Sequence, residues 1–500
     1  MTSVRVTMLV EELLRAGLLV SEHGVLPQTV SGIADDSRAV TEGGLFLAVR
    51  GSERDGHDYL GAAEKAGAAV AVVDDASRTN LPSLVVTDAR RAAAVAAAAF
   101  FGDPARDLRL VGVTGTNGKT TTVGMLRHLL DNPVEQAASI GTLGVLIGSA
   151  GESIPGGAGL TTPGPVELQR VLRTLLDRGV RTVAMEASSH ALQQGRLEGL
   201  RFEAGVFTNF TRDHLDYHLT MDAYLAAKAI LVSLLTPGGA AVVNADDAAW
   251  NALPSAPRTL RFGGDESAEV RARDVTYGSR GSDWTLVLGA HVHHVHLPLI
   301  GDFNVSNALA AAAAAWALGM QPADIARRLA TLPQVPGRLE IISQQPLVLR
   351  DYAHTPDALA RTLDAVRPFT TGELIVVFGC GGDRDRGKRP EMGRIAQAKA
   401  DRAIVTSDNP RTEDPERILD DIETGMAPGR HERFVDRREA IGRALAHAAV
   451  PAAPAQNATV FEPVIVLAGK GHETYQIRGT MKFPFDERVI VREILDGTMN

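Results

Sequence analysis

The sequence predicts an α/β protein with three domains, and three observations support this. The chain has 500 residues, too many for one hydrophobic core at roughly 100–200 residues per domain. Residues 108–122 form a short apolar run that leads into a glycine-rich loop. Strand-like and helix-like segments then alternate, which is typical of parallel sheets covered by helices. Proline-containing stretches near 102–107 and 334–337 place the expected domains at 1–107, 108–336 and 337–500.

Composition excludes several classes of protein. A net charge of −9 argues against a broad nucleic-acid-binding surface. The single cysteine, Cys380, rules out an internal disulfide and favours a reducing compartment. The apolar runs 92–101 and 308–320 are shorter than the roughly 18–20 residues of a membrane helix, and residues 1–20 do not resemble a secretory signal. We therefore expect a cytoplasmic protein that binds neither membrane nor nucleic acid.

The first expected domain contains short β-type runs separated by alanine-rich helical sequence. The runs cover residues 44–49, 68–73 and 83–87. This alternation predicts a small α/β unit.

The second expected domain opens with a phosphate-binding loop. Gly115 and Gly118 allow the backbone to approach an anion closely. Lys119 is placed to reach the outer phosphates, and the Thr120 hydroxyl is a typical Mg²⁺ ligand. A helix expected at 123–130 directs its positive end at the same anion. The alternative is a plain glycine-rich turn, but the strand before the loop and the helical sequence after it favour nucleotide binding.

Two later segments of this domain carry metal-ligand chemistry. An apolar strand at 182–185 delivers Glu186 to its carboxyl end, where it could bind Mg²⁺ or only cap a helix. After a second strand at 204–208, His214 lies in a cluster of His, Asp and Asn residues, as a ligand or as a structural histidine. Lys228 follows in an apolar helical stretch, where a bare ammonium is unfavourable. From the residues alone we expect a salt bridge, to Asp213 or Asp216.

The end of the second domain alternates apolar and polar residues. Between 257 and 300 this pattern, clearest at 284–288 and 292–299, predicts an antiparallel insertion. The four histidines of 291–296 resemble a metal-binding tract, but strand alternation divides them between two faces. We therefore do not expect a zinc site there.

The third expected domain repeats the α/β pattern. Its four apolar strands are each followed by a loop rich in Gly, Asp or Pro, and they span 347–352, 374–379, 403–407 and 464–468. Ligands bind at the carboxyl ends of such strands. The loops at 379–389, 408–411 and 469–473 combine arginines, carboxylates and backbone donors, which suits a substrate with both a carboxylate and an ammonium.

Together these motifs identify a resemblance to the Mur ligases, ATP-dependent enzymes that form amide bonds in peptidoglycan synthesis and so serve cell-wall growth, cell shape and division. The matching segments are Thr114–Thr121, Glu186–His190, Asn209 with His214, Gly301–Ala308 and Gly337–Glu340. The resemblance implies a monomer with a UDP-sugar-binding domain (1–107), a central ATP-binding domain (108–336) and a Rossmann-like amino-acid-binding domain (337–500).

The resemblance also implies the residues that bind ATP and Mg²⁺. Lys119, Glu186, His214 and Lys228 would be catalytic, with Lys228 carbamylated by CO₂ so that it offers anionic oxygen instead of a cation. Thr120, Glu186, His214 and Lys228 would hold the metal. The implied ATP contacts are Gly115, Thr116, Asn117, Gly118, Lys119, Thr120, Thr121, Asn304, Arg338 and Asp351.

Two substrate sites follow from the same resemblance. UDP-N-acetylmuramoyl-dipeptide would contact Ser37, Thr161, Thr162, Ser188, Gln194 and Arg196. The run Asp408–Arg411 matches the signature of members that add meso-diaminopimelate. Arg411 and Arg384 would bind its second carboxylate, and Glu473 with the Gly469 carbonyl would receive its ammonium. The full implied set is Arg384, Asp408, Asn409, Pro410, Arg411, Gly469 and Glu473.

The implied reaction forms an acyl phosphate on the D-Glu γ-carboxylate, which the amine of diaminopimelate then attacks. It requires the outer domains to close on the centre, which is a hypothesis. A lysine-adding or folylpolyglutamate-type ligase is the nearest alternative, and a nucleotide-dependent switch is a more distant one. Arg411 argues against a lysine-adding or folylpolyglutamate-type ligase, because the substrates of those enzymes do not present the zwitterion of diaminopimelate at this point.

Overall fold

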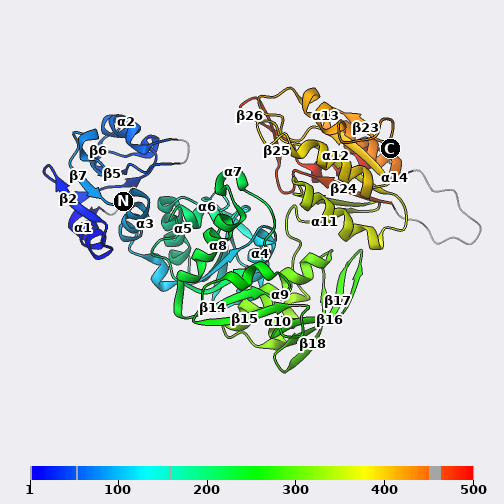
Figure 1. The fold of residues 1–500 in the computed structure, drawn as a ribbon, viewed down its shortest axis with the longest axis horizontal. Helices are drawn as coiled ribbons and strands as arrows, with labels where there is room; N and C mark the ends of the chain where they lie inside the picture. The colour runs from blue at the N-terminus through cyan, green and yellow to red at the C-terminus, as the bar shows by residue number, and fades with distance from the viewer. Residues whose placement is uncertain (1–2, 52–53, 158, 450–462, 499–500) are drawn as a thin grey trace, which may run out of the picture. The chain divides into compact units, whose positions relative to one another are not determined.

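The computed structural model describes residues 3–51, 54–157, 159–449 and 463–498, and it confirms the α/β class (Figure 1). The chain divides into two compact units. The first comprises Met1–Arg273, Leu286–His293 and Ser306–Leu329, and the second comprises Asp274–Thr285, His294–Val305 and Ala330–Asn500. The division into three domains at 107/108 and 336/337 stays a prediction.

The N-terminal part of the first unit contains a five-stranded sheet in the order β2-β7-β6-β5-β4. Only the β2–β7 pair is antiparallel. Alanines of α3 are fully buried in the core of this part, which explains the apolar run seen in the sequence. The elements are β1 (Val4–Arg5), α1 (Val6–Arg15), β2 (Leu19–His23), β3 (Thr29–Val30), β4 (Ile33–Ala34), β5 (Gly44–Leu47), α2 (Leu60–Lys65), β6 (Ala68–Val73), β7 (Ser83–Val86) and α3 (Ala89–Phe100).

An 11-stranded sheet follows, in the order β11-β10-β9-β12-β8-β13-β14-β15-β16-β17-β18. Strands β9, β12, β8, β13, β14 and β15 pair in parallel. The strands are β8 (Arg109–Thr114), β9 (Gln136–Gly141), β10 (Gly144–Ile147), β11 (Glu152–Ile154), β12 (Val180–Glu186), β13 (Phe202–Phe207), β14 (Leu235–Asn244), β15 (Arg258–Gly263), β16 (Val270–Gly278), β17 (Gly281–Leu288) and β18 (His291–Leu297).

The helices between and after these strands are α4 (Lys119–Leu130), α5 (Pro165–Asp177), α6 (Ser189–Gln193), α7 (Leu215–His218), α8 (Met221–Ser233), α9 (Asp302–Ala317) and α10 (Pro322–Leu329). The helix after the phosphate loop begins at Lys119, not at 123 as predicted. Thr120, Thr121 and Thr122 have modest helix propensity, but all three are buried, so tertiary packing sets the start of the helix.

The predicted insertion at 257–300 begins differently in the structure. β15 pairs in parallel with β14, and Phe262 and Gly263 pair in parallel with Val270 and Arg271 of β16. The start of the segment therefore extends the parallel sheet. The alternation at 284–288 and 292–299 falls mainly in β17 and β18, but alternation does not encode strand direction.

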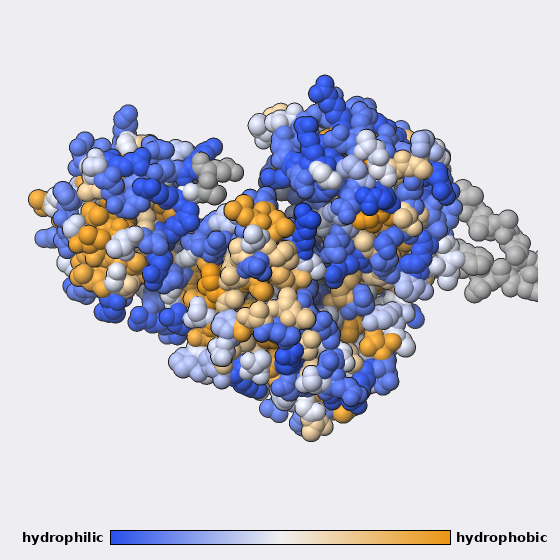
Figure 2. All heavy atoms as spheres, in the orientation of Figure 1, coloured by the Kyte–Doolittle hydropathy of each residue, from blue (hydrophilic) through white to orange (hydrophobic). Residues whose placement is uncertain are grey.

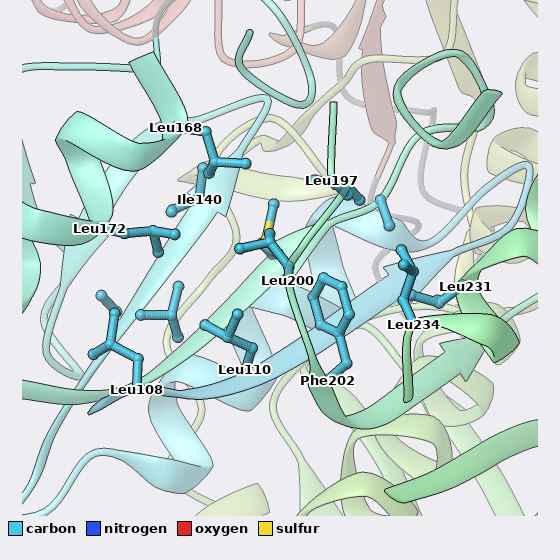
Figure 3. Packing of buried hydrophobic residues seen from close by; sticks show 14 of the residues in the cluster. Leu108, Leu110, Ile140, Leu168, Leu172, Leu197, Leu200, Phe202, Leu231 and Leu234 are labelled. Atoms are coloured by element: carbon cyan, nitrogen blue, oxygen red, sulfur yellow. The ribbon is translucent and has the colours of Figure 1, made fainter. Parts of the chain in front are cut away.

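The core of the central sheet determines where α8 lies. Gly112 in β8 has no side chain, and a Cβ there would lie 2.9 Å from Leu231 Cδ1 and 3.1 Å from Phe202 Cδ1. Figure 3 shows Leu231 and Phe202 among the buried residues of this cluster. The glycine lets α8 approach β8 closely, which brings Lys228 of α8 to the phosphate loop.

The second unit contains a six-stranded sheet in the order β19-β20-β24-β21-β22-β23. Helices α11, α12 and α13 contribute to one hydrophobic cluster, and α14 and α15 to another. The elements are β19 (Glu340–Gln344), β20 (Leu347–Asp351), α11 (Pro356–Val366), β21 (Leu374–Phe378), α12 (Lys388–Lys399), β22 (Arg402–Thr406), α13 (Pro415–Glu423), β23 (Glu432–Phe434), α14 (Arg437–Ala449), β24 (Val464–Ala468), β25 (Tyr475–Arg478), β26 (Met481–Pro484) and α15 (Glu487–Thr498).

The four predicted apolar strands of this part, β20, β21, β22 and β24, are parallel neighbours in the sheet. The loops that follow them therefore emerge at one edge, as expected for a ligand site. On the surface, hydrophilic residues cover most of the visible face and hydrophobic ones form separate patches (Figure 2). Among the described residues, every helix is too short or too polar to cross a membrane.

Candidate active site

The phosphate loop between β8 and α4 is held by the residues that follow β13. The Thr116 amide donates to the Asn209 carbonyl at 2.7 Å, and the Asn117 amide donates to Asn209 Oδ1 at 2.9 Å. Thr208 Oγ1 donates to the Asn117 carbonyl at 2.7 Å. These hydrogen bonds to the chain after β13 hold the loop in its conformation without a bound ligand.

Two glycines leave the space that this close contact between the phosphate loop and its neighbours requires. Gly115 has a φ of 145°, and a Cβ there would lie 1.9 Å from Thr208 Oγ1. Gly118 has a φ of 85°, and a Cβ there would lie 2.3 Å from Asn307 Oδ1. Neither position accommodates another residue without moving its neighbours, in agreement with the phosphate-loop interpretation.

Two lysines contact the loop backbone. Lys119 Nζ donates to the carbonyls of Gly115 and Thr116 at 2.9 and 2.8 Å. Lys228 Nζ donates to the Gly115 carbonyl at 2.7 Å and lies 4.3 Å from the centre of the Tyr224 ring. The Lys228 side chain is fully buried, and burial followed by the charge of Lys119 places its pKa well below the ordinary value.

The expected salt bridge from Lys228 to Asp213 or Asp216 is wrong, since no such pair forms between these described residues. A backbone carbonyl neutralises the ammonium only in part. Lys228 is thus a buried amine that forms no ion pair with a carboxylate of the described residues, and it lies close to the loop that is expected to hold the phosphates.

Glu186 is the last residue of β12, as predicted, and is almost fully buried. Its Oε1 accepts from the Thr142 amide at 2.8 Å, and its Oε2 lies 3.3 Å from Thr142 Oγ1. A Cβ on Gly141 would lie 2.3 Å from Glu186 Oε1. The turn after β9 therefore fixes the carboxylate at the carboxyl end of the sheet.

His214 belongs to an aromatic cluster above the same sheet edge. Its ring lies 4.8 Å from that of His190, which in turn lies 4.2 Å from that of Tyr217. Burial, with the charge of His214 second, lowers the pKa of His190 to about 4. Burial also lowers the pKa of His218 to about 4. Both imidazoles are therefore neutral at pH 7.

Four of the residues expected to bind the UDP-linked substrate are joined by hydrogen bonds. Thr162 Oγ1 donates to the Glu186 carbonyl at 2.7 Å and accepts from the Ser188 amide at 3.1 Å. Arg196 Nη1 donates to the Thr162 carbonyl at 3.0 Å, and its Nη2 donates to Gln194 Oε1 at 2.6 Å. This arrangement presents a guanidinium beside the Glu186 strand end.

Thr161 and Ser37 complete the predicted set. Thr142 Oγ1 donates to Thr161 Oγ1 at 3.4 Å. Ser37 begins a short 3-10 turn, Ser37–Ala39. A Cβ on Gly164 would lie 3.4 Å from Asp35 Oδ2, so the chain just before Ser37 adjoins the segment that contains Thr161.

In the second unit, two predicted ATP residues, Arg338 and Asp351, lie near the end of β20. The Asp351 carboxylate accepts from the amides of Leu339 and Ala353, at 2.8 and 2.9 Å, and from Thr362 Oγ1 at 3.1 Å. The Arg338 guanidinium lies 4.6 Å from the centre of the Tyr352 ring. Asn304 Nδ2 donates to the Ile300 carbonyl at 2.8 Å. Contact of these residues with ATP stays a prediction.

The residues expected to bind the amino acid lie together at the ends of β22 and β24. Asn409 Nδ2 donates to Glu473 Oε2 at 2.8 Å. Arg411 Nη1 donates to the Gly382 carbonyl at 2.9 Å. A Cβ on Gly381 would lie 2.8 Å from Arg411 Nη1 and 3.7 Å from Arg384 Cγ, so both arginines flank this glycine.

The backbone of this site is shaped by the hairpin β25–β26. Arg411 has a φ of 52°, and its amide donates to the Ile477 carbonyl at 3.1 Å. Pro410, which precedes it, is buried. Gly469 has a φ of 112°, and a Cβ there would lie 3.1 Å from Asp408 Oδ2. The structure thus brings all seven predicted diaminopimelate residues to one region.

The predicted metal ligands combine donor types that suit Mg²⁺ with a lysine that does not. Among the described residues, no three His, Cys, Asp or Glu side chains could together hold a metal ion. Glu186, His214 and the Thr120 hydroxyl supply oxygen and nitrogen donors, but the Lys228 ammonium would repel a cation. A carbamate on Lys228 would add anionic oxygens, which a hard cation prefers.

The sequence left several supporting residues unidentified. Thr142 fixes the Glu186 carboxylate, and Tyr217 accepts a hydrogen bond from Gln194 Nε2 at 3.0 Å. Lys470 contacts Asn409, one of the residues expected to bind the amino-acid substrate. Each acts on a partner at least 20 residues away in the sequence. Tyr217 lies in the His/Asp cluster already noted, so proximity in the sequence could have suggested it.

Comparison with known proteins covers nearly the whole chain. Residues 29–112 match the model "Mur ligase family, catalytic domain", 113–315 match "Mur ligase middle domain", and 337–471 match "Mur ligase, glutamate ligase domain". UDP-N-acetylmuramoyl-L-alanyl-D-glutamate–2,6-diaminopimelate ligase of Geobacter metallireducens is 45% identical over 495 residues, with 93% of this chain and 94% of that protein covered. The enzyme of the same name from Synechococcus elongatus is 43% identical, with 94% and 95% covered.

Solved structures agree. A UDP-N-acetylmuramoyl-L-alanyl-D-glutamate–2,6-diaminopimelate ligase has a TM-score of 0.66 at 34% identity, with 96% of this chain and 98% of that chain covered. MurF of Acinetobacter baumannii has a TM-score of 0.65 at 20% identity, with 100% and 99% covered. Folylpolyglutamate synthase of Mycobacterium tuberculosis has a TM-score of 0.62 at 19% identity, with 75% and 92% covered. The last two likenesses concern the fold alone.

Proposed function

This chain belongs to the Mur ligase family of ATP-dependent ligases, and we propose that it joins meso-diaminopimelate to UDP-N-acetylmuramoyl-L-alanyl-D-glutamate in peptidoglycan synthesis. The new amide bond forms between the γ-carboxylate of D-Glu and one amine of diaminopimelate. ATP is the co-substrate, and ADP and phosphate are released. We further propose that the enzyme works as a monomer in the cytoplasm and so contributes to growth and division of the cell wall.

The turn Asp408–Arg411 is the observation that carries this proposal. It places the Arg411 guanidinium near Arg384 across Gly381, and Asn409 against Glu473. Cations and a carboxylate thus lie within one site, as the zwitterionic end of diaminopimelate requires. L-Lysine has no second carboxylate, so these arginines would be left unpaired or would repel its ammonium, at a cost of about 1–3 kcal/mol or more.

In the first step, an oxygen of the γ-carboxylate attacks the γ-phosphorus of ATP, and the bond to the ADP oxygen breaks. The amides of the phosphate loop and the Lys119 ammonium bind phosphate oxygens and offset their charge. Thr162, Ser188, Gln194 and Arg196 hold the UDP-linked substrate beside the end of β12. When bound by Thr120, Glu186, His214 and modified Lys228, Mg²⁺ would neutralise the phosphate oxygens.

Carbamylation of Lys228 gives this buried lysine a chemical role. The amine attacks CO₂, a C–N bond forms, and one proton is released. The product is an anion, whereas the unmodified side chain contacts the Gly115 carbonyl and the Tyr224 ring. The burial of Lys228 beside the phosphate loop supports a carbamate there that would help to hold a cation.

In the second step, the neutral amine of diaminopimelate attacks the acyl phosphate. A tetrahedral intermediate forms and expels phosphate, which needs no Ser or Cys nucleophile. Arg411 and Arg384 bind the distant carboxylate, and Glu473 with the Gly469 carbonyl receives the distant ammonium. Fixing that end orients the attacking amine and reduces the entropy lost on the way to the transition state.

Phosphate release tests the proposal. It is measured with ATP, Mg²⁺ and UDP-N-acetylmuramoyl-L-alanyl-D-glutamate, with meso-diaminopimelate or L-lysine added in parallel. We expect release with diaminopimelate only, and Arg411→Ala to lower kcat/KM for diaminopimelate about tenfold or more. Arginine and alanine both carry a Cβ, so the backbone strain at this φ of 52° is similar in the variant.

Arg386→Ala is the matched control. Arg386 lies in the same loop as Arg384, but its exposed side chain pairs with Glu413 at 3.1 Å. Its loss should leave kcat/KM unchanged. Equal release with lysine would refute the role of Arg411 and favour a lysine-adding ligase, whereas release independent of any amino acid would favour a nucleotide switch.

A further inference from the structure

Lys470 has a buried ammonium beside the proposed amino-acid site. The residue follows β24, and its side chain is completely buried. Its Nζ lies 3.1 Å from Asn409 Oδ1, 3.3 Å from Glu473 Oε2 and 3.5 Å from Asp408 Oδ1. Burial of a charge is unfavourable unless the charge is paired and hydrogen-bonded. All three partners belong to the residues proposed to bind diaminopimelate.

The backbone around Lys470 is fixed independently of these contacts. The amides of Gly469 and Gly471 donate to the Asp351 carbonyl at 3.0 and 3.2 Å. On the other side, a Cβ on Gly337 would lie 2.1 Å from the His472 nitrogen, so Gly337 packs directly against the loop. The chain therefore places the ammonium before any substrate binds.

The ammonium determines how the Asn409 amide is oriented. Asn409 Oδ1 accepts from Lys470 and also from the Ile477 amide, at 2.9 Å. With two donors at Oδ1, the amide oxygen must face Lys470, and Nδ2 is left to donate to Glu473 Oε2 at 2.8 Å. Without the ammonium, one of the two bonds that select this orientation is lost.

Glu473 is oriented in the same way. Its Oε2 accepts from both Asn409 Nδ2 and Lys470 Nζ. Within the part of the chain that the structure describes, no hydrogen bond to Oε1 is formed. One carboxylate oxygen is thus occupied by the protein, and the other is left to accept from a substrate ammonium.

We propose that Lys470 is a positioning residue that presents Asn409 and Glu473 to the distant ammonium of diaminopimelate. This inference rests on the proposed function. Lys470 does not touch the substrate itself. Its charge also offsets those of Asp408 and Glu473, and this favours the zwitterionic end of diaminopimelate over the singly positive end of L-lysine.

The test compares steady-state kinetics of the full-length wild type, Lys470→Met, Lys470→Arg and Lys482→Met. Lys482→Met is the matched control: Lys482 lies on the neighbouring hairpin, is exposed, and its Nζ is 4.0 Å from the centre of the Tyr475 ring. KM is measured for diaminopimelate, ATP and the UDP-dipeptide, with kcat/KM for L-lysine. Thermal unfolding identifies the variants that are folded.

We expect Lys470→Met to raise KM for diaminopimelate about tenfold or more and to leave KM for ATP nearly unchanged. Discrimination against L-lysine should fall, and Lys470→Arg should recover part of the loss because it keeps the charge. In a Glu473→Gln background, Lys470→Met should have a much smaller effect, since both substitutions act on one contact.

An unchanged KM for diaminopimelate in folded Lys470→Met would overturn the inference, and so would a similar rise in all three KM values. If Lys470→Met does not fold, Lys470→Gln, which keeps a donor without the charge, decides by the same criteria. A wild type that uses no diaminopimelate would refute the proposed function and the inference with it. If the wild type uses diaminopimelate and Lys470→Met has the same KM for it, only the inference about Lys470 is refuted.

Discussion

At the scale of single residues, the phosphate loop depends on two glycines, Gly115 and Gly118, that the sequence predicts. Gly115 and Gly118 both have positive φ, and each would place a Cβ within 2.3 Å of a neighbouring oxygen. The sequence predicts that these glycines shape the loop. The sequence does not show that the side chains of Thr208 and Asn307 leave no room for a Cβ at these glycines, because the contacts join distant parts of the chain.

Gly115→Ala should therefore abolish tight ATP binding. The new Cβ would lie 1.9 Å from Thr208 Oγ1, which donates to the Asn117 carbonyl. We expect a loss of stability of about 1–3 kcal/mol and an ATP affinity lowered about tenfold or more. Calorimetric titration with ATP and thermal unfolding measure both.

Gly102→Ala separates this effect from backbone strain alone. Gly102 has a φ of 73°, but a Cβ there meets no atom within 4 Å. The Gly102→Ala variant should lose about 1–2 kcal/mol of its free energy of unfolding, and its affinity for ATP should be normal. Normal ATP affinity in Gly115→Ala would show that the loop relaxes around the methyl group and that the close contact between the loop and its neighbours is not needed.

At the scale of secondary structure, apolar runs predicted where the strands lie, and this is why Glu186 was expected at a strand end. Strand direction was not predictable from them: β15 is parallel to β14, although its sequence alternates. The sequence predicts α4 from residue 123, but the helix begins at Lys119, because the burial of Thr120–Thr122 outweighs their modest helix propensity. The contacts of Lys228 and Lys470 could not be predicted for a related reason, since their partners Gly115 and Asn409 are remote in sequence.

Helices α14 and α15 offer a test of how burial changes the value of an ion pair. Arg437 and Glu487 are completely buried and 2.8 Å apart, and Arg437 Nη2 also donates to the Ala468 carbonyl. Glu487→Gln would leave the guanidinium buried without its carboxylate. We expect the free energy of unfolding to fall by about 3–5 kcal/mol, measured by urea denaturation.

A second pair on the same helices provides the control. Arg438 and Glu493 are 2.7 Å apart, with about half of each side chain exposed. Glu493→Gln should lower the free energy of unfolding by only about 0–1 kcal/mol. Similar losses in the free energy of unfolding for the two variants would mean that burial does not determine how much the Arg437–Glu487 pair stabilises the fold.

At the scale of the whole molecule, the proposed reaction is divided between the two compact units. The phosphate loop, Glu186 and the UDP-substrate residues belong to the first unit, whereas Arg411 and Glu473 belong to the second. The acyl phosphate and the amine must come within bonding distance in the second step. Because each group would be held by a different unit, we expect domain closure at that moment.

Small-angle X-ray scattering should therefore detect closure when all ligands are present. We expect the radius of gyration to fall towards about 23 Å, the value for a compact chain of 500 residues. The sample contains a non-hydrolysable ATP analogue, Mg²⁺, the UDP-dipeptide and diaminopimelate. Arg411→Ala with the same ligands should close less, because diaminopimelate binds it more weakly. Identical profiles with and without ligands would contradict closure, since both halves of the site would then have to meet in the ligand-free enzyme.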